Sequence, residues 1–518
     1  MNGAQALIRT LVGCGVDACF TNPGTSEMHF VAALDDVPEM RGVLALFEGV
    51  ATGAADGYAR LAGRPATTLL HLGPGLGNGL ANLHNARKGA VPIVNIVGDH
   101  ATYHAKYDAQ LQSDIQTVAR NVSGWIRTSS TPGDAGADAA AAVQAAQGPP
   151  GQIATLILPA DVCWLDGGEV AAQQLPPAPT PVSGEVVEDA ARALRSGEPA
   201  ALMVGGGALR ERGLMAASRI AGATGAQLLC ETFPTRLERG AGLPAVTRLA
   251  YLAEFAMDQL AGLRHLVLVD AKSPVSFFAY PGKPSDLVPE GCQVHVLATG
   301  ADDVPGALEN LAAALDAPAD GAAPVDAGRP GLPNGALTAD SVAQAIGALL
   351  PDNAIVADEA NTSGLTIPFH TAGCPRHDWL TLTGGAIGQG LALATGAAVA
   401  CPDRKVVSLE AEGSALYTIQ ALWTQAREGL DVTTIVFNNR SYAILNLELN
   451  RVGAEEPGPR ARDMFDLSRP EMDFVSIASG LGVPATRATT AEELSDQLAR
   501  ALAEPGPALI EAIVPPIV

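Results

Sequence analysis

Lysine is scarce in this 518-residue sequence. Only five of the 32 basic residues are lysines, and 55 acidic residues bring the formal net charge to −23. A protein that binds nucleic acid or adsorbs on anionic lipid needs a cationic surface, so this charge balance argues against both classes. An anionic ligand would have to be held by local donors, such as backbone N–H groups and hydroxyls, against the overall field.

Paired cysteines and long apolar runs are also missing. The seven cysteines are scattered, odd in number and never arranged as CxxC, which favours reduced thiols over a disulfide framework. No apolar run reaches about 18 residues, the length that a membrane-spanning helix needs. The N-terminus has no cationic segment followed by an apolar one, so it does not resemble a signal peptide. We therefore expect a soluble, cytoplasmic protein.

Two segments rich in proline, alanine and glycine, 170–184 and 317–335, interrupt the sequence as linkers do. They divide the chain into predicted domains at 1–170, 185–318 and 335–518. This number agrees with the length, which allows about three domains of ordinary size.

Short apolar runs alternate with longer helical stretches in all three segments. This alternation predicts an α/β fold with three doubly wound parallel-sheet domains, whose sites lie at the carboxyl ends of strands. The clearest predicted strands are at 43–47, 66–72, 91–99, 353–360, 405–411, 432–439 and 507–514.

The third segment carries the strongest candidate site. Glu412 follows one predicted strand, Asn438 and Asn439 follow the next, and Gly413 and Ser414 open the helix between them. N–H groups at the start of a helix suit a phosphate, and the carboxylate and amide oxygens suit Mg²⁺ shared with a diphosphate. The alternative is an ordinary strand–turn–helix with a solvated glutamate and a turn-forming asparagine pair.

This pattern resembles the fingerprint of the thiamine-diphosphate-dependent enzymes, which is Gly-Asp-Gly, some two dozen residues, then Asn-Asn. Here residues 414–437 separate Gly413 from Asn438. Two positions depart from the fingerprint: Ala411 replaces the first glycine and Glu412 replaces the aspartate. The resemblance implies pyrimidine-binding, central and diphosphate-binding domains, in that order.

The resemblance also implies roles for individual residues of the third segment. Mg²⁺ would be held by the Glu412 carboxylate, the Asn439 side chain and the backbone carbonyl of Ser441. Ile387, in the GGAIG run, would support the bent cofactor, and the Gly385 carbonyl would accept from its 4′-amino group. The whole implied cofactor-binding set is Asn361, Thr362, Gly385, Ile387, Gly413, Ser414 and Tyr442. For the glycines, the alternative is close helix–sheet packing.

Glu48 closes an apolar strand ahead of a helix of small residues. Taken alone, it could be an acidic residue at the start of a surface helix. The resemblance implies a catalytic role instead. Its carboxyl would hydrogen-bond ring nitrogen N1′ of the cofactor and stabilise the imino tautomer that activates the thiazolium carbon.

The segments TNPGTSE and LLHLGPGLGN resemble benzoylformate decarboxylase, which makes Thr25 and His71 candidates for binding the substrate carboxylate or moving protons. A histidine at the end of a strand is otherwise a core residue. Acetolactate synthase is the other similar family, with Gln112 as a possible match to its catalytic glutamine. Its flavin-binding motif is absent, which argues against FAD. Phe277 and Phe278, if they line the same cavity, would favour an apolar substrate side chain.

Together these features predict a thiamine-diphosphate- and Mg²⁺-dependent enzyme that decarboxylates a 2-oxo acid. It would be a lyase that releases an aldehyde, or a transferase of the acetolactate synthase type that joins two substrates. The alternative from another class is a cofactor-binding relative with little activity, acting as a structural or regulatory partner. The resemblance further implies a homodimer or homotetramer with active sites shared between chains.

Overall fold

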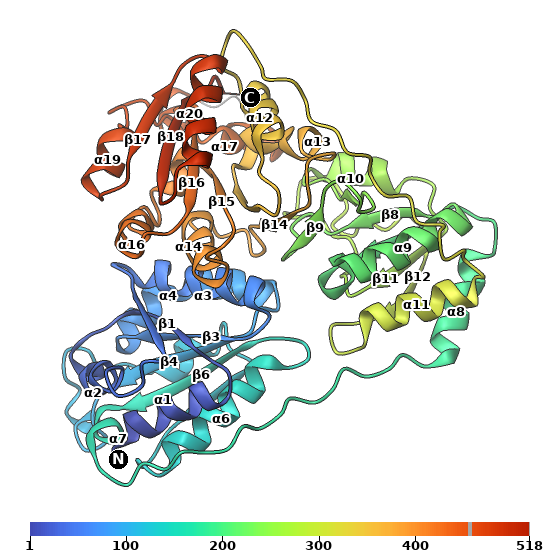
Figure 1. Ribbon diagram of the computed structural model, residues 1–518. Coiled ribbons are helices and arrows are strands. Elements are labelled where there is room, and N and C mark those ends of the chain that lie inside the picture. The colour runs from blue at the N-terminus through green and yellow to red at the C-terminus, as the bar shows by residue number, and fades with distance from the viewer. Residues whose placement is uncertain (454–457, 517–518) are drawn as a thin grey trace.

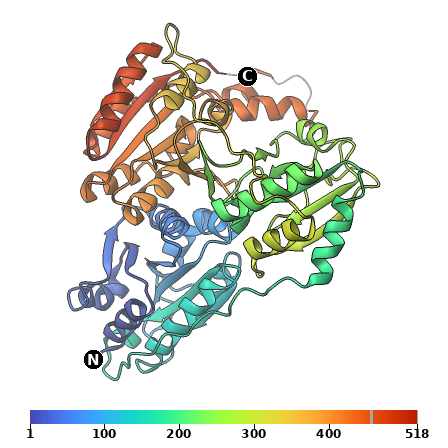
Figure 2. The same ribbon diagram turned by 45° about the vertical axis from the view of Figure 1, so that its right-hand side comes forward.

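The computed structural model describes residues 1–453 and 458–516. Three sheets, each flanked by helices, follow one another along the chain (Figures 1 and 2). The prediction of three α/β domains dominated by parallel strands is confirmed. No helix among the described residues is long and apolar enough to cross a bilayer.

The N-terminal sheet has six parallel strands in the order β2-β1-β3-β4-β6-β5. They are β1 (Ala18–Asn22), β2 (Arg41–Leu44), β3 (Ala66–Leu70), β4 (Ile93–Asp99), β5 (Trp125–Thr128) and β6 (Ile153–Pro159). Helices α1 (Gly3–Gly13) and α6 (Asp134–Gln147) cover one face, and α3 (Glu48–Ala62) and α4 (Leu72–Lys88) cover the other. Shorter elements of this domain are η1 (Thr25–Glu27), α2 (Met28–Ala33), η2 (Ala105–Tyr107), α5 (Ile115–Ala119) and α7 (Ala160–Trp164).

A long connection without regular elements leads to the central sheet, whose strand order is β10-β8-β7-β11-β12 (Figure 1). Its strands are β7 (Ala200–Val204), β8 (Gln227–Cys230), β10 (Thr247–Arg248), β11 (His265–Val269) and β12 (Gln293–Ala298). Its helices are α8 (Gly184–Leu194), η3 (Gly206–Leu209), α9 (Glu211–Thr224), α10 (Ala253–Leu260) and α11 (Val304–Ala314).

The C-terminal sheet has seven strands in the order β17-β18-β16-β15-β13-β14-β9. The strands from its own segment are β13 (Ile355–Glu359), β14 (His377–Thr381), β15 (Val406–Ala411), β16 (Val432–Asn438), β17 (Ala485–Ala488) and β18 (Ala508–Ile513). The edge strand β9 (Leu237–Arg239) comes from the central segment and pairs antiparallel with β14. This single antiparallel strand lets two domains share one sheet.

The helices of the C-terminal domain include one that the sequence analysis placed differently. The helix expected to open at Gly413 is the short α15 (Glu412–Ala415), and the longer helix, α16 (Ala421–Glu428), begins after a further turn. The others are α12 (Ala339–Leu349), η4 (Asn361–Gly364), α13 (Ile367–His370), α14 (Gly390–Ala400), α17 (Ala443–Arg451), α18 (Pro459–Asp463), α19 (Phe474–Gly480) and α20 (Ala491–Ala503).

Helices α3 and α14 join the first and last domains through backbone-close packing (Figure 1). A Cβ atom at Gly57 would lie 2.0 Å from the carbonyl oxygen of Leu393, and one at Gly396 would lie 1.8 Å from that of Ala54. Glycine is therefore required at both positions, because no neighbouring backbone atom can move away cheaply. This contact positions the two halves of the candidate site described below.

Candidate active site

Three predicted residues gather at the carboxyl edge of the N-terminal sheet. Glu48 is the first residue of α3 beyond β2, Thr25 lies in η1 beyond β1, and His71 directly follows β3. Because β2, β1 and β3 are adjacent, their carboxyl ends meet at one edge. The Glu48 side chain is buried at 6% exposure, and Asn78 Nδ2 donates to its Oε2 at 3.0 Å.

Glu48 and His71 both lie close to Gly75. A Cβ atom at this glycine would be 3.2 Å from Glu48 Oε1 and 3.4 Å from His71 Cβ. The glycine-rich start of α4 therefore lets the carboxylate and the imidazole approach the same short stretch of backbone. The structure brings these two predicted catalytic residues together.

His71 has a buried carboxylate partner. Its Nδ1 lies 2.8 Å from Oε2 of Glu27, whose side chain is almost wholly buried. The Ser26 hydroxyl donates to the other oxygen of Glu27 at 2.6 Å, and the Gly24 N–H donates to Oε2 at 2.8 Å. The carboxylate thereby holds both the histidine and the turn that carries Thr25.

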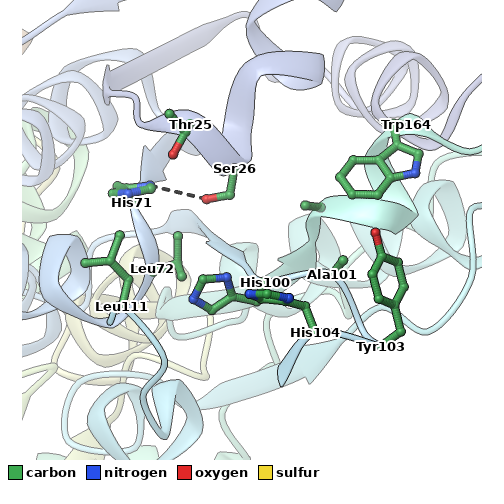
Figure 3. A pocket seen from close by; sticks show the side chains of 11 residues that line it. Thr25, Ser26, His71, Leu72, His100, Ala101, Tyr103, His104, Leu111 and Trp164 are labelled. Atoms are coloured by element: carbon green, nitrogen blue, oxygen red, sulfur yellow. Dashed lines mark hydrogen bonds between the residues drawn. The ribbon is translucent and has the colours of Figure 1, made fainter. Parts of the chain in front are cut away.

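A cavity of about 250 Å³ opens beside His71 (Figure 3). It runs along the carboxyl edge of the sheet, past the ends of β1, β3, β4 and β6. Its lining residues are Thr25, Ser26, His71, Leu72, His100, Ala101, Tyr103, His104, Leu111, Ala160 and Trp164. Phe277 and Phe278 do not belong to this lining, so the condition for an apolar substrate side chain is not met within one chain.

The second half of the site lies at the carboxyl edge of the C-terminal sheet, where β13, β15 and β16 are neighbours. Asn361 Nδ2 donates to the Ser414 hydroxyl at 2.9 Å, and the Ser441 N–H donates to Glu412 Oε1 at 3.0 Å. The Ser441 N–H also lies 2.9 Å from Asn439 Oδ1. The predicted diphosphate and metal residues therefore converge.

Glu412 is nearly inaccessible to solvent, at 1% exposure. Burial raises the pKa of its carboxyl to about 7, although backbone N–H groups at Ser441, Asn439 and Arg440 act in the opposite direction. Its oxygen set with Asn439 and the Ser441 carbonyl is hard and suits Mg²⁺. The carboxylate already faces the turn that carries the other two groups.

Tyr442 and Thr362 complete this half. Tyr442 precedes α17, and a Cβ atom at Gly413 would lie 2.3 Å from its ring carbon Cε1, so Gly413 makes room for the ring in its present position. Thr362 lies in η4 next to Asn361, which adopts a left-handed φ of 50°. Both predicted residues therefore lie at the same edge as Ser414.

The GGAIG loop between β14 and α14 carries Gly385 and Ile387. Gly385 and Gly388 have φ angles of 74° and 93°, which other residues rarely adopt. Glu359 Oε1 accepts the Gly388 N–H at 2.7 Å, and its second oxygen accepts the Gly390 N–H. The buried Glu359 carboxylate therefore fixes the end of this loop through two hydrogen bonds.

The same loop also contacts an aromatic side chain of the central domain. A Cβ atom at Gly385 would lie 2.6 Å from Phe277 Cζ, which places the aromatic cluster of Phe277, Phe278, Phe233 and Tyr251 over this loop. Phe277 therefore belongs to the cofactor half of its own chain.

Four residues of the site were not identified from the sequence: Glu27, Ser26, Asn78 and His100. Glu27 could have been found from its position three residues after Gly24, where it closes a capping turn. His100 directly follows β4, as His71 follows β3. Gln112, the possible match to a catalytic glutamine, has a buried Oε1 atom with no hydrogen-bond partner among the described residues.

Two family models match the chain. The model described as thiamine pyrophosphate enzyme, N-terminal TPP binding domain, matches residues 1–120, and the corresponding C-terminal TPP binding domain matches residues 365–512. The first range contains Thr25, Glu48 and His71, and the second contains Glu412, Asn439 and Ser441, while Asn361 and Thr362 lie just before it. The chain belongs to the thiamine pyrophosphate enzyme family, as the sequence analysis predicted.

Individual relatives narrow the family to two types. The chain is 64% identical, over 100% of both chains, to IlvX of Mycobacterium tuberculosis, which carries the provisional name acetolactate synthase large subunit. It is 30% identical to benzoylformate decarboxylase of Pseudomonas aeruginosa, over 96% of each chain. The chain is thus a thiamine-pyrophosphate-dependent enzyme of the acetolactate synthase and benzoylformate decarboxylase type.

A solved structure supports the fold. The thiamine diphosphate-dependent 4-hydroxybenzoylformate decarboxylase of Rhodococcus jostii RHA1 superposes with a TM-score of 0.87 at 24% identity, covering 99% of both chains. At this identity the similarity establishes the architecture alone.

Proposed function

We propose that this protein uses thiamine diphosphate and Mg²⁺ to decarboxylate a 2-oxo acid. The observation that carries the proposal is that Glu48 and His71 both lie close to Gly75, and that His71 lines a cavity with hydroxyl and imidazole groups. The seven cysteines are free in the structure, which fits the cytoplasmic location that we also propose.

The residues present fit this cofactor. Ser414, Asn361 and the turn around Gly413 would hold the diphosphate, and Glu412, Asn439 and the Ser441 carbonyl would hold Mg²⁺. Gly385 and Ile387 would contact the rings of the cofactor. When bound, thiamine diphosphate supplies the carbon nucleophile that adds to the 2-oxo carbonyl and the electron sink that CO₂ departure requires.

Glu48 would keep a proton shared with the aminopyrimidine nitrogen N1′. Asn78 fixes one carboxyl oxygen by donating to Oε2. The side chain is buried, so water does not compete for the other oxygen. The hydrogen bond from Asn78 and the burial together fix the orientation in which the Glu48 carboxyl would meet N1′.

His71 and Thr25 would bind the substrate carboxylate. Local donors have to do this work because the net charge of −23 opposes an anion. With Nδ1 engaged by Glu27, the opposite nitrogen of His71 is the one available to the substrate. It would also move the proton that replaces CO₂ when an aldehyde forms.

The test is to offer pyruvate, 2-oxobutyrate, branched 2-oxo acids, 2-oxoglutarate and benzoylformate separately, with cofactor and Mg²⁺. Released CO₂ is measured alongside aldehydes and acyloins. Aldehyde alone supports a lyase, whereas acetolactate from pyruvate supports a transferase. If the cofactor is demonstrably bound and no 2-oxo acid releases CO₂, the proposed function is wrong.

We further propose that two chains share each active site, in a homodimer or homotetramer. Apolar side chains are exposed next to both halves: Leu46 beside Glu48, and Leu416 and Tyr417 beside Ser414. Exposed apolar groups clustered around an active site are typical of an interface. Contact between the Glu48 half of one chain and the Glu412 half of another would cover them.

A further inference from the structure

The cavity extends well beyond the residues assigned to catalysis. Its residues follow the strand order of the sheet: Thr25 beyond β1, His71 beyond β3, His100 beyond β4, and Trp164 beyond β6 (Figure 3). Glu48 lies beyond β2, outside the opposite end of this row. The reacting carbonyl therefore belongs near Thr25 and His71, and the rest of a substrate would run toward β4 and β6.

The far part of the cavity is built from histidines. His100 and His104 both line it, with their ring centroids 5.2 Å apart, and Tyr103 lies next to them (Figure 3). The Nε2 atom of His100 is buried and has no hydrogen-bond partner among the described residues. A buried polar atom without a partner costs free energy, so it points to a ligand that supplies one.

None of the aspartates and glutamates in the described part of the chain lines this cavity, although the protein as a whole is strongly acidic. Three acidic residues close to the lining residues accept hydrogen bonds from other protein groups. Glu27 holds His71, Asp161 accepts from the backbone and hydroxyl of Thr102, and Asp99 accepts the backbone N–H of His100. The cavity thus presents imidazole and hydroxyl groups to its contents, and these three carboxylates are already hydrogen-bonded to other groups.

We propose that this cavity selects 2-oxo acids that carry a second carboxylate at the end of a short aliphatic spacer. The inference rests on the proposed function and deepens it. The first carboxylate lies at Thr25 and His71, and the second lies at His100 and His104. In the register of β3 and β4 Leu70 pairs with Val97, so His71 is level with Gly98 and His100 lies two residues further along. The backbones at the two histidines are therefore separated by one strand spacing across the sheet, ~4.8 Å, and by ~6.6 Å along it. A short dicarboxylic acid spans that separation, whereas the methyl group of pyruvate leaves the second site unfilled.

The test measures binding rather than turnover. Calorimetry on the holoenzyme compares 2-hydroxyglutarate with 2-hydroxybutyrate, two reduced analogues that cannot lose CO₂ by this chemistry. We expect the dicarboxylate to bind about tenfold tighter or better, the effect of a hydrogen bond to a charged group. In the double variant His100→Phe/His104→Phe the preference should disappear, while the affinity for 2-hydroxybutyrate stays the same. His295→Phe, in the central domain, is the matched control.

Each outcome decides the proposal. Equal binding of the two analogues, no binding of the dicarboxylate, or a preference that survives the double variant overturns it. If the double variant does not fold, Tyr103→Phe and the single His104→Phe variant should each reduce the preference, and no reduction in either overturns the proposal. Failure of the proposed function has a different signature, because the holoenzyme would then release no CO₂ from any 2-oxo acid whichever analogue binds.

Discussion

The carboxylate of Glu27 lies 2.8 Å from Nδ1 of His71, and Glu27 is not among the residues that line the cavity. A carboxylate oxygen can only accept, so this contact makes Nδ1 the donor. Nε2 is then the nitrogen left for the substrate: it accepts a proton when the ring is neutral and donates to a carboxylate when the ring carries both protons. A carboxylate that fixes tautomer and orientation in this way is the arrangement by which hydrolases prepare a catalytic histidine.

Glu27→Ala should therefore lower kcat/KM without abolishing cofactor binding. We expect a loss of at least about tenfold, because the imidazole would no longer be held in one tautomer. The measurement is steady-state kinetics on the substrate that the survey of 2-oxo acids identifies, together with calorimetry for the cofactor. Glu39→Ala, at an exposed position of the same domain, should leave both unchanged. An unaltered kcat/KM in folded Glu27→Ala would contradict the assigned role.

The predictions from sequence succeeded where one strand and the residues after it suffice. Glu412 and Asn439 follow adjacent apolar strands, and parallel strands end at one edge, so their proximity could be expected. The position of Glu48 beyond the end of β2 could be expected for the same reason. In each case an apolar strand and the polar residue just after it are contiguous in the sequence, so the sequence shows both the residue and the end of the strand at which it lies.

The residues that sequence analysis missed depend on which strands become neighbours. Glu27 and His71 are 44 positions apart, and they meet only because β1 lies beside β3. The condition that Phe277 lines the substrate cavity is not met, because its ring lies against the Gly385 loop of its own chain. The antiparallel pairing of β9 with β14 likewise joins distant segments, and no periodicity in either segment records it.

Glu48→Gln should bind the cofactor and lose most turnover. The amide keeps the shape of the side chain and its contact with Asn78, but it cannot share a proton with N1′. Loss of one such proton-transfer interaction costs on the order of 10²-fold or more. Calorimetry and CO₂ release measured on the same preparation check both halves of the prediction. A near-normal rate in the purified variant would contradict it.

The buried carboxyls Glu359 and Glu410 should respond differently to the same substitution. Burial raises the pKa of Glu359 to about 7, and burial together with the charge of Glu359 raises the pKa of Glu410 well above its ordinary value. Glu359 accepts the N–H groups of Gly388 and Gly390, whereas Glu410 Oε2 has no partner among the described residues. Glu359 is thus the ionised member and Glu410 the protonated one.

Glu359→Gln places an amide NH₂ against the N–H group of Gly388 or Gly390, and we expect cofactor affinity to fall about tenfold. Glu410→Gln replaces a protonated carboxyl with a neutral group of the same shape, and the affinity should stay within about twofold. Calorimetry at one pH with saturating Mg²⁺ compares the two variants. An equal loss in both would show that the ionisation states are assigned wrongly.

Mixed chains should reveal the shared active site. Glu48→Gln chains and Glu412→Ala chains are each inactive alone, but a hybrid dimer contains one site with both wild-type residues. Random exchange should therefore restore about a quarter of the wild-type sites. Native mass spectrometry confirms that subunits exchange, and CO₂ release measures recovery. Exchanged mixtures that remain inactive would place Glu48 and Glu412 of one site on the same chain.

Metal-dependent cofactor binding should weaken on acidification, because Glu412 must be ionised to hold Mg²⁺. Burial raises its pKa to about 7, so the carboxyl takes up a proton as the pH falls through that value. A protonated carboxyl is a poor ligand. From pH 8 to pH 6 we expect the cofactor affinity in Mg²⁺ to fall by up to about tenfold, one proton being taken up per site.

Glu412→Asp should preserve or improve that affinity and reduce its dependence on pH. The longer glutamate has to fold back to reach an ion that tolerates little distortion at about 2.1 Å, and aspartate removes the extra methylene. Aspartate also has the lower ordinary pKa, so it stays ionised over more of the range. Calorimetry at pH 6 and pH 8, with Mg²⁺ or with a chelator, measures both effects, and Glu198→Asp on the surface of the central domain is the control. If cofactor binding responds neither to metal removal nor to this substitution, Glu412 is not a metal ligand and the family's aspartate has no functional counterpart at this position.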